Sequence, residues 1–200
     1  RRHRDERFFL YVPFTIPHFE LLTPEDSMKE YRGQFPEPWA YKGDHYASQP
    51  EPRTALAAMI SRMERDVGRI LDLLKKLALD RDTLVLFTSD NGGLPGLQPG
   101  TTGGLRDFKG SLYEGGIRVP AIIEWPARIK SNRITNMNAN TSDIYPTLLE
   151  LAGAPLPNNQ PVLDGTSLVS LLNGKAKRRE KPMGFWTYQA RGRPRKSRAM

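Results

Sequence analysis

The chain has 200 residues, of which 38% are hydrophobic and 9% aromatic, a composition typical of a folded globular protein. It contains no cysteine, which excludes disulfides, thiolate metal sites and a cysteine nucleophile within it. No run of 18 apolar residues occurs, so no membrane-spanning helix is expected. The formal net charge is +8, but ten of the 30 basic residues lie in residues 175–200 beside a single acid, Glu180. The remaining chain is close to neutral, which argues against a protein-wide surface for nucleic acid.

The first predicted element is a short aromatic strand over residues 8–14, which Pro13 and Pro17 close. Residues 15–53 follow as a long irregular segment rich in proline, glycine and charge. Long loops in compact domains are usually functional or disordered. This one carries four scattered residues of interest, namely Trp39, Tyr41, His45 and Tyr46.

The clearest predicted helix spans residues 55–78. Apolar side chains recur there at spacings of three and four, from Leu56 to Leu77, while charged side chains occupy the other face. Thr54 is the expected N-cap. The apolar run that follows at 83–88 predicts a central parallel strand that is covered on both faces. A helix followed by such a strand is half of a crossover unit.

Three more elements are expected in the second half of the chain. Residues 118–125 predict another strand, and residues 142–152 a helix with Ser142 as its N-cap and Gly153 as its stop. Residues 164–172 suggest a short third helix. The alternation of strands and helices predicts an α/β fold with a mostly parallel central sheet flanked by helices.

Two oxygen-bearing side chains stand directly after the second predicted strand. Ligands in open α/β sheets collect at the carboxyl ends of strands, and here Asp90 and Asn91 precede Gly92 and Gly93. A carboxylate and an amide oxygen are hard ligands that suit calcium or magnesium. The alternative is an ordinary Asx-type turn after a strand.

Two further candidates are basic. Lys109 lies in a segment, residues 92–117, that holds nine of the 17 glycines, and a lysine in such a loop can reach an oxyanion. Its alternative is a solvated surface charge. His18, at the end of the first strand region, could bind an oxyanion or donate a proton. Its alternative is a structural histidine. Glu114 and Arg118 are placed to pair across the glycine-rich loop.

Taken together, the motifs resemble the sulfatase family of the alkaline-phosphatase-like superfamily. They occur in the family's order and cover most of residues 8–172. The motifs are FFLYVPFTIPH (8–18), DVGRIL (66–71), LVLFTSDNGG (84–93), FKGSLYEGGIRVPAIIEWP (108–126), SDIYPTLLELAG (142–153) and DGTSLVSLL (164–172).

The resemblance implies roles for the candidates. Asp90 and Asn91 match a pair that binds the active-site divalent cation, usually Ca²⁺, with Asp90 also near the leaving-group oxygen. Lys109 matches a lysine that contacts the sulfate oxygens, and His18 a histidine that hydrogen-bonds the sulfate and assists the leaving group. A cation and two positive donors would neutralise charge that develops during sulfuryl transfer. Glu114, together with Arg118, Asp143 and Asp164, is expected to be structural.

The resemblance also implies parts that this sequence does not contain. The family's nucleophile is a formylglycine made from the first residue of a Cys/Ser-x-Pro-x-Arg motif, which is absent here. Residues 1–174 are therefore expected to be the C-terminal part of the catalytic domain. Residues 175–200 would be a basic tail or the start of a truncated subdomain. The isolated chain is expected to be unstable and inactive, while the intact enzyme would hydrolyse aryl or carbohydrate sulfates and be exported.

Three alternatives stay open. The first is a catalytically inactive remnant of the same fold, a pseudoenzyme. The second is a superfamily relative that acts on phosphate esters. Such enzymes usually bind two zinc ions through His and Asp ligands, and the presence of only three histidines, with a TSDNGG motif, disfavours this alternative. The third is a DNA-binding protein, because residues 191–196 resemble an AT-hook that lies in the minor groove. Nucleic acid is the less favoured partner, since charge runs are usually solvated tails.

Overall fold

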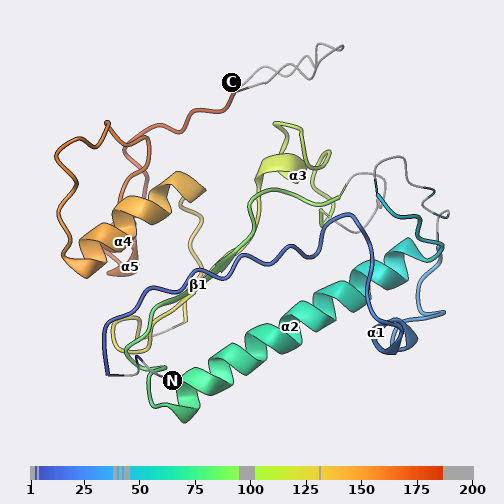
Figure 1. The fold of residues 1–200 in the computed structure, drawn as a ribbon. Helices are drawn as coiled ribbons and strands as arrows, with labels where there is room; N and C mark the ends of the chain where they lie inside the picture. The colour runs from blue at the N-terminus through green and yellow to red at the C-terminus, as the bar shows by residue number, and fades with distance from the viewer. Residues whose placement is uncertain are drawn as a thin grey trace. The chain divides into compact units, whose positions relative to one another are not determined.

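The computed structural model describes residues 5–37, 46–94, 102–130 and 132–186, together with residues 3, 40 and 42 (Figure 1). The chain divides into two compact units. Unit 1 comprises residues 1–83 and 92–118, and unit 2 comprises residues 84–91 and 119–200. Trp39, Tyr41 and His45 lie outside the described residues, and so does the AT-hook-like segment at 191–196. The predicted domain boundary between residues 174 and 175 stays a prediction.

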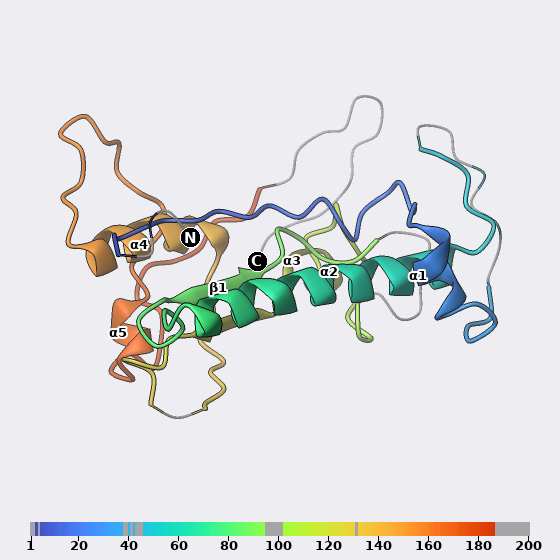
Figure 2. The same ribbon diagram turned by 60° about the horizontal axis from the view of Figure 1, so that its bottom comes forward.

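Unit 1 is built on one long helix, α2 (Pro52–Lys76), with two short helices, α1 (Glu25–Lys29) and α3 (Glu114–Ile117). Both views show α1 beside the N-terminal turns of α2 (Figure 1 and Figure 2). The buried core lies there, where the small side chains of Ala55 and Ala58 let the preceding loop approach the helix closely. Leu21, Met28 and Met59 fill the remaining space. Residues 15–53, expected to be irregular, therefore contain a helix and two of the buried core residues, Leu21 and Met28.

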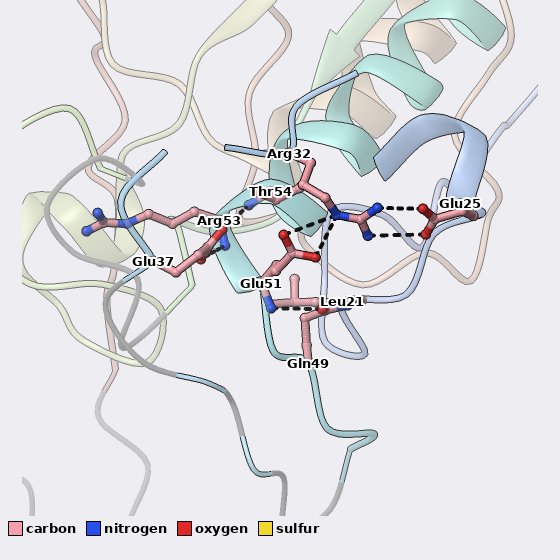
Figure 3. Close-up of polar contacts among 8 residues, drawn as sticks. All are labelled: Leu21, Glu25, Arg32, Glu37, Gln49, Glu51, Arg53 and Thr54. Atoms are coloured by element: carbon pink, nitrogen blue, oxygen red, sulfur yellow. Dashed lines mark hydrogen bonds and ion pairs between the residues drawn. The ribbon is translucent and has the colours of Figure 1, made fainter. Parts of the chain in front are cut away.

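The N-terminus of α2 is capped by a residue far from it in the sequence (Figure 3). The Glu37 carboxylate accepts hydrogen bonds of 2.9 Å from the backbone N–H groups of Arg53 and Thr54. Arg32 adds a charged link, because its guanidinium donates to Glu51, which occupies the N-cap position. The prediction that Thr54 caps the helix is therefore wrong: the helix starts at Pro52, and Thr54 lies buried inside it.

The first predicted strand is not paired in the part of the chain that the structure describes. Residues 8–14 are extended but carry no strand assignment, and Phe9 is 75% exposed. The aromatic run predicts burial in a sheet, yet a strand forms only where a neighbour supplies hydrogen bonds. No other described segment forms strand hydrogen bonds with residues 8–14.

Unit 2 contains a two-stranded sheet formed by β1 (Val85–Thr88) and β2 (Ala121–Glu124). The strands are antiparallel, with Val85 opposite Glu124 and Thr88 opposite Ala121. The sequence predicts a mostly parallel sheet, whereas the sheet within the described residues is antiparallel. An apolar run indicates burial but not strand direction, and the expected two-sided cover is only partial here.

A helical segment follows in unit 2. It begins with the 3-10 turn η1 (Thr141–Asp143), continues as α4 (Ile144–Ala152), and is joined later by α5 (Val169–Leu172). Asn140, not Ser142, is the N-cap, since its side chain accepts from the Ser142 N–H at 3.1 Å. Gly153 ends α4 with φ +65°, as predicted. The predicted helix over 164–172 shortens to its last four residues.

Within the described residues, no helix is both long enough and apolar enough to cross a membrane.

Candidate functional site

His18 and Lys109 meet in unit 1 although 91 positions separate them. The Lys109 Nζ atom lies 2.8 Å from His18 Nε2, and His18 Nδ1 bonds the carbonyl oxygen of Phe19. Because a carbonyl oxygen only accepts, Nδ1 carries the hydrogen, and Nε2 is the acceptor for the lysine. The partners thus assign one tautomer. Lys109 donates one of its three ammonium N–H groups to the imidazole, which leaves two available to other acceptors such as an oxyanion.

The loop that presents Lys109 is built on glycine. The Lys109 N–H donates to the Gly93 carbonyl at 3.0 Å, which fixes the loop against the chain that follows β1. A Cβ on Gly115 would lie 2.0 Å from the Asp107 carbonyl oxygen, and one on Gly116 would meet backbone at 2.2 Å. A real Cβ atom does not approach other atoms so closely, so only glycine at these positions allows α3 to pack beneath this loop.

The predicted pair of Glu114 and Arg118 forms an ion pair on α3. Arg118 Nη1 lies 3.1 Å from Glu114 Oε2, one helical turn away. Both side chains are largely exposed, so the pair contributes at most about 0.5 kcal/mol. The predicted pairing is confirmed, and the structural role of both residues stays a prediction.

Asp90 and Asn91 follow β1, in unit 2. The Ser89 hydroxyl donates to the Asn91 carbonyl at 3.1 Å, which holds the chain in a turn where the strand ends. The pair offers one carboxylate and one amide oxygen, both hard donors, whereas calcium takes six to eight oxygens. Among the described residues, no group of three or more His, Cys, Asp or Glu side chains is arranged for a metal. The donor type therefore fits calcium, and the donor number requires further ligands.

Sequence reasoning missed the aromatic residues beside His18. The Tyr46 ring lies edge-on to the His18 ring, with centroids 6.0 Å apart, and stacks on Phe19 at 5.6 Å. Tyr46 was visible only as one of several aromatic residues in a long loop. No spacing rule joins it to His18, since tertiary folding alone brings the two segments together.

A second missed residue is Arg179, which belongs to the basic stretch of the sequence but is buried in unit 2. Its guanidinium binds Asp143, with N–O distances of 2.5 and 2.9 Å. Asp143 also accepts from the backbone N–H groups of Asn140 and Thr166. Burial works to raise the pKa of Asp143, but these hydrogen bonds outweigh it and hold that pKa below its ordinary value. This arrangement agrees with the structural role expected for Asp143.

A charged recess on α1 and α2 is no candidate for an anion site. Its volume is about 390 Å³, and its walls carry three arginines and three acids. Each arginine faces an acid: Arg62 with Asp26, Arg65 with Glu30 and Arg69 with Asp66. Because the charges are already balanced, the recess holds no excess positive charge for a sulfate group.

Comparison with known proteins agrees with the motifs. The family model described as Sulfatase matches residues 1–154. The chain is 34% identical to a sulfatase of Formosa agariphila over 200 residues, covering 94% of this chain and 34% of that protein. It is 42% identical to human arylsulfatase A over 190 residues, covering 92% and 32%. The chain thus spans about a third of the length of these curated relatives.

Solved structures agree on the fold. The crystal structure of Ps i-CgsB in complex with k-i-k-neocarrahexaose superposes with a TM-score of 0.66 at 29% identity, covering 80% of this chain and 32% of that one. BT4656, solved with its substrate D-glucosamine-2-N,6-O-disulfate, gives a TM-score of 0.54 at 26% identity, covering 71% and 28%. With a family model matched over more than half of its residues and relatives at these identities, the chain belongs to the sulfatase family.

Proposed function

We propose that the protein carrying this chain is a sulfuric ester hydrolase, and that His18, Lys109, Asp90 and Asn91 belong to its active site. The observation that carries the proposal is the hydrogen bond between Lys109 and His18. Lys109 lies on a loop that packs against glycines at positions with no room for a Cβ. Asp90 and Asn91 are included because they match the cation-binding pair of the sulfatase motifs, within the residues that the family model matches.

The Lys109 ammonium would bind the substrate. With one N–H bond on His18, it has two more to give to the non-bridging oxygens of a sulfuryl group. Charge grows on these oxygens and on the leaving-group oxygen in the transition state, so fixed donors there lower the barrier. Held between Phe19 and Lys109, His18 is an acceptor at Nε2. It protonates a leaving group only after it takes up a proton at that atom.

Asp90 and Asn91 would supply two of the oxygen ligands of a calcium ion, which when bound neutralises negative charge on the sulfate ester. The remaining ligands and the formylglycine nucleophile would come from residues outside this sequence. Two solved relatives hold carbohydrate ligands, and one of these is a carbohydrate sulfate. This favours a carbohydrate sulfate over an aryl sulfate as the natural substrate. Export stays an expectation from the family.

The test is turnover by the full-length protein with 4-nitrophenyl sulfate as a general probe. Lys109→Ala is expected to lower kcat by about 10²-fold or more, because it removes a donor to the developing charge. Lys75→Ala, an exposed lysine of α2, is the matched control and is expected to keep the wild-type rate. A normal rate for Lys109→Ala would remove Lys109 from the site.

The metal assignment has its own readout. Asp90→Ala is expected to abolish both activity and the heat of calcium binding measured by titration calorimetry. Calcium binding that is unchanged in Asp90→Ala would refute the assignment. A full-length protein that turns over no sulfate ester would instead support the inactive relative of the same fold.

A further inference from the structure

Tyr46 is a neighbour of His18 for which the reaction described above gives no role. Its ring makes a T-shaped contact with the imidazole, at an interplanar angle of 75°, and its other close ring is Phe19 at 22°. Phe19 is also the residue whose carbonyl binds His18 Nδ1. Tyr46 therefore touches both the imidazole and the residue that fixes its tautomer.

A buried hydrogen bond three residues after Tyr46 joins the same two segments of the chain. The Gln49 side chain is 8% exposed and donates to the Leu21 carbonyl at 2.7 Å. Leu21 itself is fully buried and lies three residues after His18. Residues 18–21 and 46–49 are thus joined at both ends, by rings at one and by Gln49 at the other. Figure 3 shows the Gln49 end of this pairing beside the start of α2.

We propose that Tyr46 is a positioning residue for His18, a role that rests on the proposed sulfatase reaction. An imidazole that turns about its Cβ–Cγ bond exchanges Nδ1 with a carbon, and Nε2 then no longer faces Lys109. The Phe19 carbonyl opposes this rotation from one side, and the Tyr46 ring opposes it by edge contact. Outer residues of this kind commonly hold the orientation of a site histidine.

The test is a double-mutant cycle in the full-length enzyme, with 4-nitrophenyl sulfate as the probe. Tyr46→Leu removes the ring and is expected to lower kcat/KM by roughly 3- to 10-fold, the range of one aromatic contact. Tyr46→Phe keeps the ring and is expected to retain at least about half of kcat/KM. In a His18→Ala background, Tyr46→Leu is expected to cause no further loss, because its effect passes through the imidazole.

Tyr31→Leu is the matched control, since Tyr31 lies in the same unit and stacks on Phe35 rather than on His18. Its effect on kcat/KM is expected to be the same in both backgrounds. A second readout is the ¹⁵N spectrum of labelled histidine. The His18 signals should report the Nδ1–H tautomer in the wild type and an average of tautomers in Tyr46→Leu.

The outcomes separate the two proposals. A wild-type enzyme that turns over neither 4-nitrophenyl sulfate nor a sulfated oligosaccharide refutes the sulfatase reaction and with it the role of Tyr46 in that reaction. An active wild type in which Tyr46→Leu is silent, or lowers kcat/KM equally with and without His18, overturns the positioning role alone. Unchanged histidine tautomers in Tyr46→Leu overturn it as well.

Discussion

The pair of Asp143 and Arg179 offers the sharpest test of what stabilises unit 2. Asp143 is 0% exposed and Arg179 is 8% exposed, and two N–O contacts join them. The carboxylate also accepts from the backbone of Asn140, before η1, and of Thr166, before α5. One side chain therefore ties two separate segments, at Thr166 and Arg179, to the start of α4.

Asp143→Ala leaves the Arg179 guanidinium buried without its counter-charge, and it leaves two backbone N–H groups without acceptors. Removing one partner of a buried ion pair costs about 3–5 kcal/mol of unfolding free energy. The matched control is Asp66→Ala on α2, whose partner Arg69 is 82% exposed. An exposed pair of that kind contributes about 0–1 kcal/mol. The comparison separates burial from charge, since both variants break one carboxylate–arginine contact.

The assay is urea unfolding, followed by tryptophan fluorescence because Trp125 lies in unit 2. With a slope of about 2–3 kcal/mol per molar urea, Asp143→Ala should lower the midpoint by roughly 1–2 M. A double variant, Asp143→Leu with Arg179→Met, removes both charges and should recover part of that loss. If Asp143→Ala moves the midpoint no more than Asp66→Ala does, the buried pair does not stabilise unit 2 more than an exposed pair.

The pH dependence of stability follows from the same group. The folded-state pKa of Asp143 lies below its ordinary value of 3.8, because hydrogen bonds from Arg179, Thr166 and Asn140 outweigh the opposing effect of burial. A lowered carboxyl pKa contributes stability that is complete above the unfolded-state pKa and is lost as the pH falls through the folded-state pKa. The wild type should therefore lose unfolding free energy below about pH 4, and Asp143→Asn should lose less of it over the same window.

Three further predictions concern unit 1. Gly115→Ala would place a Cβ 2.0 Å from backbone and should cost about 1–3 kcal/mol in urea unfolding, whereas Gly68→Ala, with open space on α2, should stabilise the helix by about 0.5–1 kcal/mol. Glu37→Ala should lower the unfolding free energy by about 1 kcal/mol by removing the cap of α2, while exposed Glu64→Ala should leave it unchanged within about 0.5 kcal/mol. Phe9→Lys should reduce self-association of the 200-residue chain in sedimentation velocity, because charge protects an unpaired extended segment, and an unchanged profile would contradict that reading.

Local pattern predicted the elements whose cause is local. The helix over 55–78 is predictable because its apolar spacing follows its own period, and its predicted end at residue 78 lies two residues beyond the end of α2 at Lys76. Gly153 was found because a left-handed residue at a helix end is a property of glycine itself. The family motifs likewise lie within short stretches, so they were readable without knowledge of the fold.

What the sequence could not show is which distant groups meet. Glu37 caps a helix that starts 15 residues later. Strand direction failed for the same reason, because apolar runs at 83–88 and 118–125 are equally compatible with either pairing. Each error arose where a backbone group took its partner from elsewhere in the chain.

Charge in this protein has to be interpreted residue by residue. Composition assigns Arg179 and Arg178 alike to a basic stretch, yet Arg179 is buried against Asp143 and holds unit 2 together. Lys109 is similarly one lysine among many, but its ammonium donates a hydrogen bond to His18, 91 positions away. Both residues gain a specific role from a partner that burial or a glycine-built loop brings within 3 Å. The exposed pair of Arg69 with Asp66, one helical turn apart, contributes little by comparison.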